Sequence, residues 1–299
     1  MTNQTNLGGS FTLPGTSMSL KRMGYGAMQL AGPGVWGPPR DVDAAIAVVR
    51  EAVALGINHI DTSDFYGPHI TNQIIRQALH PYPEGLAIVT KVGARRGEDK
   101  SWQVALSPKE LIDAVHDNLQ NLGLEALDVV NLRLPDQQES AEVFIEKPLT
   151  VLADLKRQGL IRHIGLSNIT PQQFAEAQSI TEIVCVQNQY NLAHRDDDPL
   201  IDELARLNIA FTPFFPLGGF TPLQSSALEA AAALLKATPM QVALAWLLQR
   251  SPNILLIPGT SSVEHLRENL KAATLELTPE TIADLDSIAA NAGVTAEMH

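Results

Sequence analysis

Short apolar runs alternate with longer amphipathic stretches along almost the whole of this chain. The strand-like runs lie at residues 23–28, 57–61, 86–91, 127–132, 161–165, 183–187, 209–214 and 253–257. Apolar residues at helical spacing separate or follow them, at 41–56, 71–80, 108–122, 147–159, 171–179, 198–207, 239–250, 262–272 and 278–290. A strand followed by a helix, repeated eight times, predicts a parallel sheet covered by helices.

Such a sheet either stays open or closes into a barrel. An open doubly wound sheet usually carries a G-x-G-x-x-G turn between its first strand and first helix. The sequence GYGAM at 24–28 lacks that spacing, and no helical pattern follows it directly. Eight units in 299 residues match a (β/α)8 TIM barrel instead. We therefore predict a single α/β barrel domain over residues 1–299, with an N-terminal extension and a C-terminal helix.

Charge and composition argue against several classes of partner. The chain has 21 Lys and Arg against 33 Asp and Glu, a net charge of −12, without any basic cluster. This balance disfavours binding to nucleic acid or to an anionic membrane. The first twenty residues lack the pattern of a signal peptide, and no apolar run approaches the ~20 residues of a membrane span. With Cys185 as the single cysteine, no intrachain disulfide can form. We expect a soluble, cytoplasmic protein without a metal site, a monomer by default, although the sequence leaves an oligomer open.

Polar residues gather where several of the predicted strands end. The segment DTSDFY follows the second strand, Lys91 ends the third, Arg133 follows the fourth, and Ser167 and Asn168 follow the fifth. In a barrel of this kind the active site lies in the loops at the carboxyl ends of the strands. These side chains should therefore converge on one rim.

Asp61, Tyr66 and Lys91 are the strongest candidates for chemistry on that rim. An ammonium beside a phenol favours loss of the phenolic proton, and an aspartate keeps the ammonium charged and oriented. Such a phenol can give a proton to a developing alkoxide while a hydride arrives from the other side. The alternatives are a purely structural Asp61–Lys91 ion pair and a Tyr66 that only anchors its loop.

Several segments together resemble one known family. They are GYGAMQL (24–30), NHIDTSDFYG (58–67), IVTKVG (88–93), HIGLSN (163–168), VQNQYN (186–191), FFPLGG (214–219) and IPGTSSVEHLREN (257–269). In this order they resemble the aldo-keto reductases along nearly the whole chain, and most of all the bacterial members that reduce pyridoxal. The resemblance implies an NAD(P)H-dependent reductase that converts an aldehyde or ketone to an alcohol. Pyridoxal is then an expected small-molecule substrate, and NADPH the expected cofactor, with NADH as the alternative.

The resemblance also implies roles for individual residues. It makes Tyr66 the general acid, with Lys91 and Asp61 as its tuning pair. It assigns cofactor contacts to Gly26, Ala27, Met28, Ser167, Asn168, Gln187, Phe214, Leu217, Gly218, Gly259, Thr260, Ser261, His265, Arg267, Glu268 and Asn269. Without it, Ser167 and Asn168 could equally cap the helix that begins near Pro171, and Phe214 could be a core residue. The hydroxyls at 260–262 open a helix, whose first amides favour an anion.

Three further rim residues are candidates for the substrate pocket because they lie in the loops after strands one, two and six. These are Trp36, Asp64 and Tyr190. The alternative for Asp64 is a solvated loop carboxylate, and the alternative for Trp36 is an anchor for its own loop.

Two features depart from the family pattern. Arg133 stands where a histidine usually orients the substrate carbonyl, and we expect it to act as a fixed cation and forked donor beside that oxygen. The alternative is an ion pair with Asp128 or Asp136. Gly259 and His265 stand where many members have Lys and Arg, which leaves Arg267 and the hydroxyls to hold a 2′-phosphate.

Two other functions stay open. A lysine at the end of a barrel strand can form a Schiff base, so Lys91 could serve an aldolase. Alternatively, the chain could be a cofactor-binding accessory or sensor protein with little turnover, and the arginine at position 133 would then mark lost activity.

Overall fold

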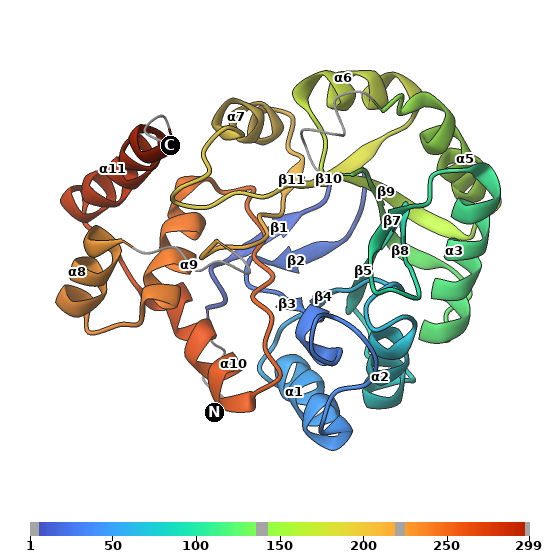
Figure 1. Ribbon diagram of the computed structural model, residues 1–299, viewed down its shortest axis with the longest axis horizontal. Coiled ribbons are helices and arrows are strands. Elements are labelled where there is room, and N and C mark those ends of the chain that lie inside the picture. The colour runs from blue at the N-terminus through green and yellow to red at the C-terminus, as the bar shows by residue number, and fades with distance from the viewer. Residues whose placement is uncertain (1–5, 136–142, 219–224, 297–299) are drawn as a thin grey trace.

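The computed structural model describes residues 6–135, 143–218 and 225–296, with side chains described as far as residue 289. Seven parallel strands form one curled sheet, ringed by helices (Figure 1). Their order in the sheet is β11 (Ala210–Phe211), β10 (Ile183–Gln187), β9 (Ile161–Ser167), β8 (Leu127–Arg133), β5 (Ala87–Val92), β4 (His59–Asp61) and β3 (Tyr25–Gly26). The sheet therefore follows chain order from β3 to β11, as a (β/α)8 barrel requires.

The segment expected to form the eighth strand closes the barrel without being a regular strand. Ile254 forms a parallel bridge with Phe211, and Gly259 forms one with Gly26. The backbones approach so closely here that a Cβ on Gly26 would lie 2.3 Å from the Ile257 oxygen, and one on Gly259 would lie 2.8 Å from the Gly26 oxygen. The predicted barrel is confirmed, but the continuous strand predicted at 253–257 is wrong, because single bridges close this seam.

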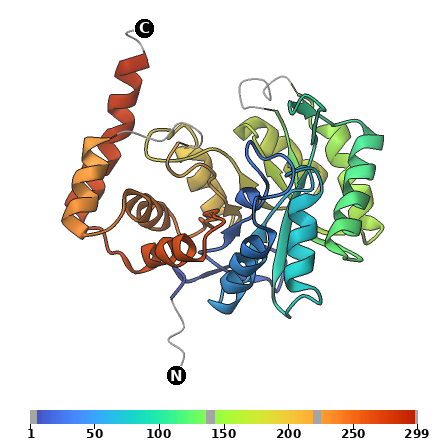
Figure 2. The same ribbon diagram turned by 60° about the horizontal axis from the view of Figure 1, so that its bottom comes forward.

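Helices cover the outer face of the sheet. They are α1 (Val42–Ala54), α2 (Ile70–Leu79), α3 (Pro108–Leu122), α5 (Glu146–Arg157), α6 (Pro171–Ile180), α7 (Asp198–Arg206), α9 (Pro239–Arg250) and α10 (Val263–Leu270). Two more, α8 (Ser226–Leu235) and α11 (Pro279–Ala296), lie side by side at one edge of the molecule (Figures 1 and 2). The sequence patterns had not predicted α8. Within the described residues no single helix is long and apolar enough to cross a membrane; α8 and α9 reach that length only together, across a 93° bend.

Side-chain caps explain where several helices begin. The Asp41 carboxylate accepts a hydrogen bond from the Ala44 amide and so caps the start of α1. Thr170 forms a capping box with Gln173 at the start of α6, with a proline at the first helical position. Ser167 and Asn168 therefore do not cap this helix, and that alternative for them is wrong.

The N-terminal extension is an antiparallel hairpin of β1 (Ser10–Thr12) and β2 (Ser19–Lys21). Its Leu13 and Leu20 belong to the same buried cluster as Ala87 and Val129, which lie near the amino ends of their strands. The hairpin thus covers the amino-terminal end of the barrel with apolar side chains. The carboxyl ends of the strands form the opposite end, where the polar residues lie.

Candidate active site

Lys91 and Asp61 meet inside the carboxyl end of the barrel. Lys91 Nζ lies 2.5 Å from Asp61 Oδ1, and both side chains are only 5% exposed. The same ammonium donates to the Thr62 carbonyl oxygen at 3.0 Å. Burial alone would lower the pKa of Lys91, but the Asp61 carboxylate and the Tyr66 phenol outweigh burial and raise that pKa above its ordinary value. Lys91 is therefore held as a cation.

Tyr66 lies directly beside this cation. Lys91 Nζ is 5.2 Å from the centroid of the Tyr66 ring, and the tyrosine is 8% exposed. Its backbone amide donates to the Ser63 oxygen at 3.1 Å, and its ring meets Phe65 edge-on, with centroids 5.3 Å apart. The structure thus brings together the three side chains that the sequence placed on one rim.

Gln187 holds the second oxygen of Asp61. Its Nε2 donates to Asp61 Oδ2 at 2.9 Å, so both carboxylate oxygens have a partner. Nearby, the Cys185 thiol donates to Asn131 Oδ1 at 3.2 Å, and burial raises the pKa of that thiol to about 12. Cys185 is therefore an inert core thiol, and it takes no part in the ion pair of Asp61 and Lys91.

Ser167 ends β9 and Asn168 follows it at the same end of the barrel, and both are buried. The Asn168 amide donates to the Gln187 oxygen at 3.1 Å, and its side-chain Nδ2 donates to the Leu134 oxygen at 3.2 Å. Asn168 has a φ of 59°, in the left-handed region that asparagine tolerates better than most residues. Ser167 pairs in register with Gln187, whose side chain bonds Asp61, so hydroxyl- and amide-bearing residues of β9 and β10 are neighbours here.

The first strand supplies a second wall of the same site. Gly26 and Ala27 are buried, and the Ala27 amide donates to the Asp61 backbone oxygen at 2.8 Å. Met28 is half-buried and contacts the apolar cluster that contains Tyr66. The chain segments near residues 26 and 61 therefore lie against each other. One cofactor could contact both segments only in such an arrangement.

The segment after the seventh strand is only partly enclosed. Phe214 is half-buried and meets Phe215 edge-on, with ring centroids 5.1 Å apart. Leu217 and Gly218 are also half-buried, and the Gly218 amide donates to the Phe215 oxygen at 3.0 Å. The following residues, 219–224, lie outside the described chain.

The start of α10 offers backbone amides to an anion. Ser262 caps the helix by accepting from the His265 amide at 3.3 Å, and Thr260 Oγ1 accepts from the Ser262 amide at 3.1 Å. Ser261 and His265 are exposed. A helix N-terminus next to hydroxyl groups suits a phosphate.

The remaining predicted contacts on α10 are less favourably placed. Arg267 is 60% exposed, and its guanidinium lies 2.7 Å from the Glu51 carboxylate. The Glu268 backbone oxygen accepts from Gln241 at 2.8 Å, and the Asn269 side chain is buried. A 2′-phosphate would therefore compete with Glu51 for Arg267.

Asp64 is occupied by other side chains. Its Oδ1 accepts from Asn72 and Asn121 at 3.0 Å each, and its Oδ2 lies 2.6 Å from His69 Nδ1. This buried network holds the loop that precedes α2 and argues against the predicted substrate contact. Asp64, His69 and Asp117 also offer ligand atoms within 4.8 Å of one another, but the existing partners of Asp64 leave no reason to place a metal there.

Tyr190 lies in the core between barrel and helices. It has no exposed surface, its hydroxyl donates to Asp198 Oδ1 at 2.5 Å, and its ring stacks on Trp246 with centroids 5.9 Å apart. Burial of the ring with a bonded hydroxyl argues against the predicted substrate contact. Tyr190 supports α7 and α9 instead.

Arg133 ends β8 next to the site. It pairs in register with Ser167, is half-buried, and its Cζ lies 5.8 Å from the centroid of the Trp102 ring. Asp128 lies at the opposite end of β8, where it pairs with Arg162. An Arg133–Asp128 ion pair is therefore wrong, and the other proposed partner, Asp136, lies outside the described residues.

Known proteins resemble this chain in sequence and in fold. The model of the aldo/keto reductase family matches residues 22–290. The chain belongs to the aldo/keto reductase family. A pyridoxine 4-dehydrogenase of Escherichia coli K12 is 69% identical over 281 residues, covering 93% of this chain and 98% of that protein. An uncharacterized oxidoreductase of Schizosaccharomyces pombe is 40% identical over 271 residues, covering 90% and 87% of the two chains.

A solved structure agrees with this assignment. A thermostable aldo-keto reductase in complex with the inhibitor epalrestat superimposes with a TM-score of 0.79 at 30% identity, covering 93% of this chain and 99% of that one. Membership of the aldo/keto reductases makes this chain an oxidoreductase on a (β/α)8 barrel.

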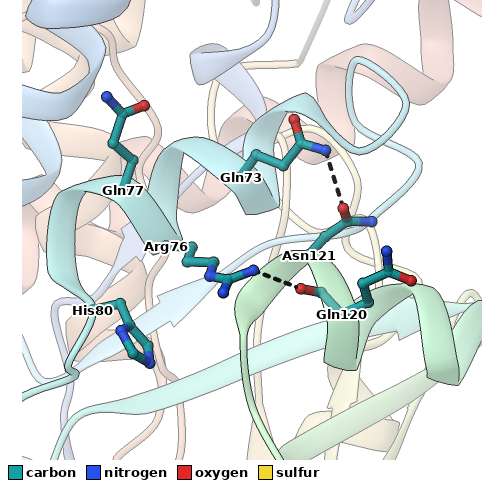
Figure 3. A pocket seen from close by; sticks show the side chains of 6 residues that line it. All are labelled: Gln73, Arg76, Gln77, His80, Gln120 and Asn121. Carbon is teal, nitrogen blue, oxygen red and sulfur yellow. Dashed lines mark hydrogen bonds between the residues drawn. The ribbon is translucent and has the colours of Figure 1, made fainter.

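An open groove lies on the outside of this aldo/keto reductase, between α2 and α3 (Figure 3). It is lined by Gln73, Arg76, Gln77, His80, Gln120 and Asn121. Figure 3 shows Gln73 bonded to Asn121 and Arg76 bonded to the Gln120 oxygen, at 3.0 and 3.1 Å. The lining groups thus tie the two helices together, and no predicted site residue lines this groove.

Sequence reasoning missed a hairpin that follows β5, formed by β6 (Ala94–Arg96) and β7 (Trp102–Val104). Its Trp102 ring meets Phe65 edge-on at 5.7 Å and lies near Arg133, so the hairpin belongs to the site. Trp36, predicted for the substrate pocket, is half-buried and also contacts this hairpin through Arg96. The sequence signal for this hairpin was ARRGEDKSWQV at 94–104, in which turn residues lie between two short runs of long side chains.

Proposed function

We propose that this chain reduces the aldehyde group of pyridoxal to the alcohol pyridoxine, with NADPH as the electron donor. The observation that carries the proposal is the buried cluster of Tyr66, Lys91 and Asp61 at the carboxyl end of the barrel. The similarity to a pyridoxine 4-dehydrogenase supports this choice of substrate. A small carbonyl compound is the partner that such a cluster suits.

The residues of the site suit each part of this reaction. A bound nicotinamide supplies the hydride. Ser167, Asn168 and Gln187 would hold its carboxamide. Gln187 bonds Asp61, Ser167 pairs with Gln187 in register, and the Asn168 amide bonds the Gln187 oxygen. The amides at the start of α10, with Thr260, would hold the phosphates.

Tyr66 would give its phenolic proton to the carbonyl oxygen as that oxygen becomes an alkoxide. Lys91 stays cationic beside the ring, so it stabilises the negative charge left on the phenol. Asp61 keeps Lys91 in place, and Gln187 keeps Asp61 in place. Arg133 would stabilise the alkoxide as a forked donor that keeps its own proton.

The structure disfavours a Schiff-base aldolase. Attack on a carbonyl needs an uncharged lysine, but the pKa of Lys91 is raised by Asp61 and Tyr66 despite its burial. Lys91 is therefore better suited to electrostatic support than to covalent catalysis.

One assay tests the proposal directly. Purified protein is mixed with NADPH and a panel of aldehydes that includes pyridoxal, loss of NADPH absorbance is followed, and the alcohol is identified by chromatography. We expect turnover with pyridoxal. Tight NADPH binding without aldehyde-dependent oxidation would favour the accessory or sensor function. Trapping of substrate on Lys91 by borohydride would favour the aldolase.

A further inference from the structure

Arg96 joins two segments of chain beside Tyr66. Its guanidinium lies over two indole rings, with Cζ 4.1 Å from the Trp102 centroid and 5.3 Å from the Trp36 centroid. Its terminal nitrogens donate to the Val35 oxygen at 2.7 Å and to the Lys100 oxygen at 2.8 Å. No carboxylate of the described residues lies within ion-pair distance of Arg96. Its terminal nitrogens bond carbonyl oxygens and its charge faces aromatic rings, whereas its buried Nε has no hydrogen-bond partner among the described groups. These contacts make Arg96 a link between two loops.

A hydrogen-bonded path leads from Arg96 to the Tyr66 loop. The Val35 oxygen that accepts from Arg96 also accepts from the Gly67 amide, at 3.1 Å. Gly67 directly follows Tyr66, so one carbonyl group connects the guanidinium to the backbone that carries the phenol. A shift of Val35 would move that backbone.

An aromatic path leads to the same place. Arg96 covers the Trp102 ring, Trp102 meets Phe65 edge-on at 5.7 Å, and Phe65 meets Tyr66 edge-on at 5.3 Å. Edge-to-face contacts at these distances are favourable and orient both rings. The phenol ring is therefore set by a chain of packed rings that ends at Arg96.

The backbone around Val35 needs such support. Val35 has a φ of 56°, in the left-handed region that a β-branched residue rarely adopts, and its neighbour Gly34 has a φ of 69°. Val35 is buried in one cluster with Phe65, Tyr66 and Ala94. Strained conformations of this kind persist only where surrounding contacts hold them, and they gather at functional sites. Arg96 supplies two such contacts, to the Val35 and Gly34 oxygens.

We propose that Arg96 is a positioning residue for Tyr66. It clamps residues 34–35 and the β6–β7 hairpin against the Tyr66 loop, and so keeps the phenol beside Lys91 in the geometry for proton transfer. The role rests on the proposed carbonyl reduction, but it is exerted through Val35 and Trp102, without contact to the reacting atoms. A lysine cannot replace Arg96, because it lacks both the planar stack on the indoles and the forked donors.

The test is the single-turnover rate of NADPH oxidation, measured by stopped flow with pyridoxal and saturating NADPH. We expect Arg96→Lys to lower this rate about tenfold, since small misplacements of a catalytic group are costly. A merely structural role would reduce the amplitude, which reports the folded fraction, and leave the rate unchanged. Trp102→Phe should lose less rate than Trp102→Leu, because phenylalanine keeps a ring against Phe65.

The neighbouring Arg95 provides a matched control. It lies on the same strand, but its side chain is 61% exposed and lies 3.7 Å from Glu110. Arg95→Lys should therefore keep the wild-type rate within about twofold. An Arg96→Lys rate within twofold of wild type, or a loss of amplitude alone, would overturn the positioning role while leaving the proposed function intact. A wild-type protein that does not oxidise NADPH with any aldehyde would instead overturn the proposed function, and the role of Arg96 in proton delivery with it.

Discussion

Lys91 and Asp61 form a buried ion pair, with Nζ 2.5 Å from Oδ1, across the neighbouring strands β5 and β4. The register explains why they meet. Asp61 pairs with Val89, and Lys91 lies two residues beyond Val89, so both side chains point to the same face of the sheet. Gln187 holds the other oxygen of Asp61 at 2.9 Å. The pair is thus a fixed feature of the barrel interior beside Tyr66.

Breaking this pair should cost both stability and activity. Asp61→Asn leaves the Lys91 ammonium buried without its carboxylate, which typically destabilises a protein by about 3–5 kcal/mol. Urea unfolding at pH 7 measures the loss. The double variant Asp61→Asn with Lys91→Met removes the unpaired charge and should recover part of the stability, without recovering turnover. A fully stable Asp61→Asn protein would contradict the importance of the pair.

Tyr66→Phe should abolish proton delivery while leaving the cofactor site in place. We expect turnover to fall by at least ~10²-fold, the usual scale for general acid catalysis, with the Kd for NADPH nearly unchanged. Steady-state kinetics and a fluorescence titration measure the two quantities. Tyr82→Phe is the control, because the Tyr82 hydroxyl bonds only the Leu122 oxygen among described groups, at 2.7 Å. Near-normal turnover of Tyr66→Phe would remove Tyr66 from the mechanism.

Arg133→Leu should lower kcat/KM for pyridoxal and largely spare cofactor affinity. Loss of one donor to an oxyanion costs about 2–4 kcal/mol, which corresponds to a fall of roughly 30- to 1,000-fold. Arg162→Leu, at the opposite end of the barrel strands, is the control and should keep the kcat/KM of the wild type. If Arg133→Leu behaves like the wild type, Arg133 is part of the scaffold.

The cofactor preference should depend on Arg267. We expect a lower Kd for NADPH than for NADH, and we expect Arg267→Gln to raise the Kd for NADPH about tenfold, the scale of one charge-assisted hydrogen bond. NADH lacks the 2′-phosphate, so its Kd should hardly change. Glu51→Gln frees Arg267 from its present partner and should not weaken NADPH binding. Equal Kd values for the two cofactors in the wild type would contradict the preference.

Acid should destabilise the barrel through His59. This side chain is buried, and neither ring nitrogen has a hydrogen-bond partner among the described groups. Burial lowers the pKa of His59 from 6.5 to about 4. The pKa of His59 is lower in the folded state than in the unfolded state, so protonation of this side chain favours unfolding. The free energy of unfolding therefore has its full value above pH 6.5 and declines as the pH falls toward 4, by up to about 3 kcal/mol.

Urea unfolding at several pH values between 7 and 4.5 measures this decline. His59→Leu should show a shallower fall in stability over the same range, whatever its stability at pH 7. Equal slopes for the wild type and the variant would show that other groups cause the acid sensitivity.

Much of the architecture could be predicted because it follows from local patterns. The seven regular strands and most helices lie within a few residues of their apolar runs, since periods of two and 3.6 residues are local properties. The C-terminal helix, predicted at 278–290, begins at Pro279. The convergence of Asp61, Tyr66 and Lys91 followed from a general rule, that all strand ends of a parallel barrel share one rim. Location in the cell and oligomeric state stay predictions.

The sequence by itself thus determined the class of fold and the residue types available at the rim. Only the tertiary structure decided which of them act together. It closed the barrel by single bridges where a continuous strand was predicted, and it engaged Asp64 and Tyr190 in hydrogen bonds with other polar side chains. It also revealed Arg96, which links its own hairpin, at residues 100 and 102, to the distant loop at 34–36. The contacts between such loops depend on how the whole chain packs, and no local pattern encodes them.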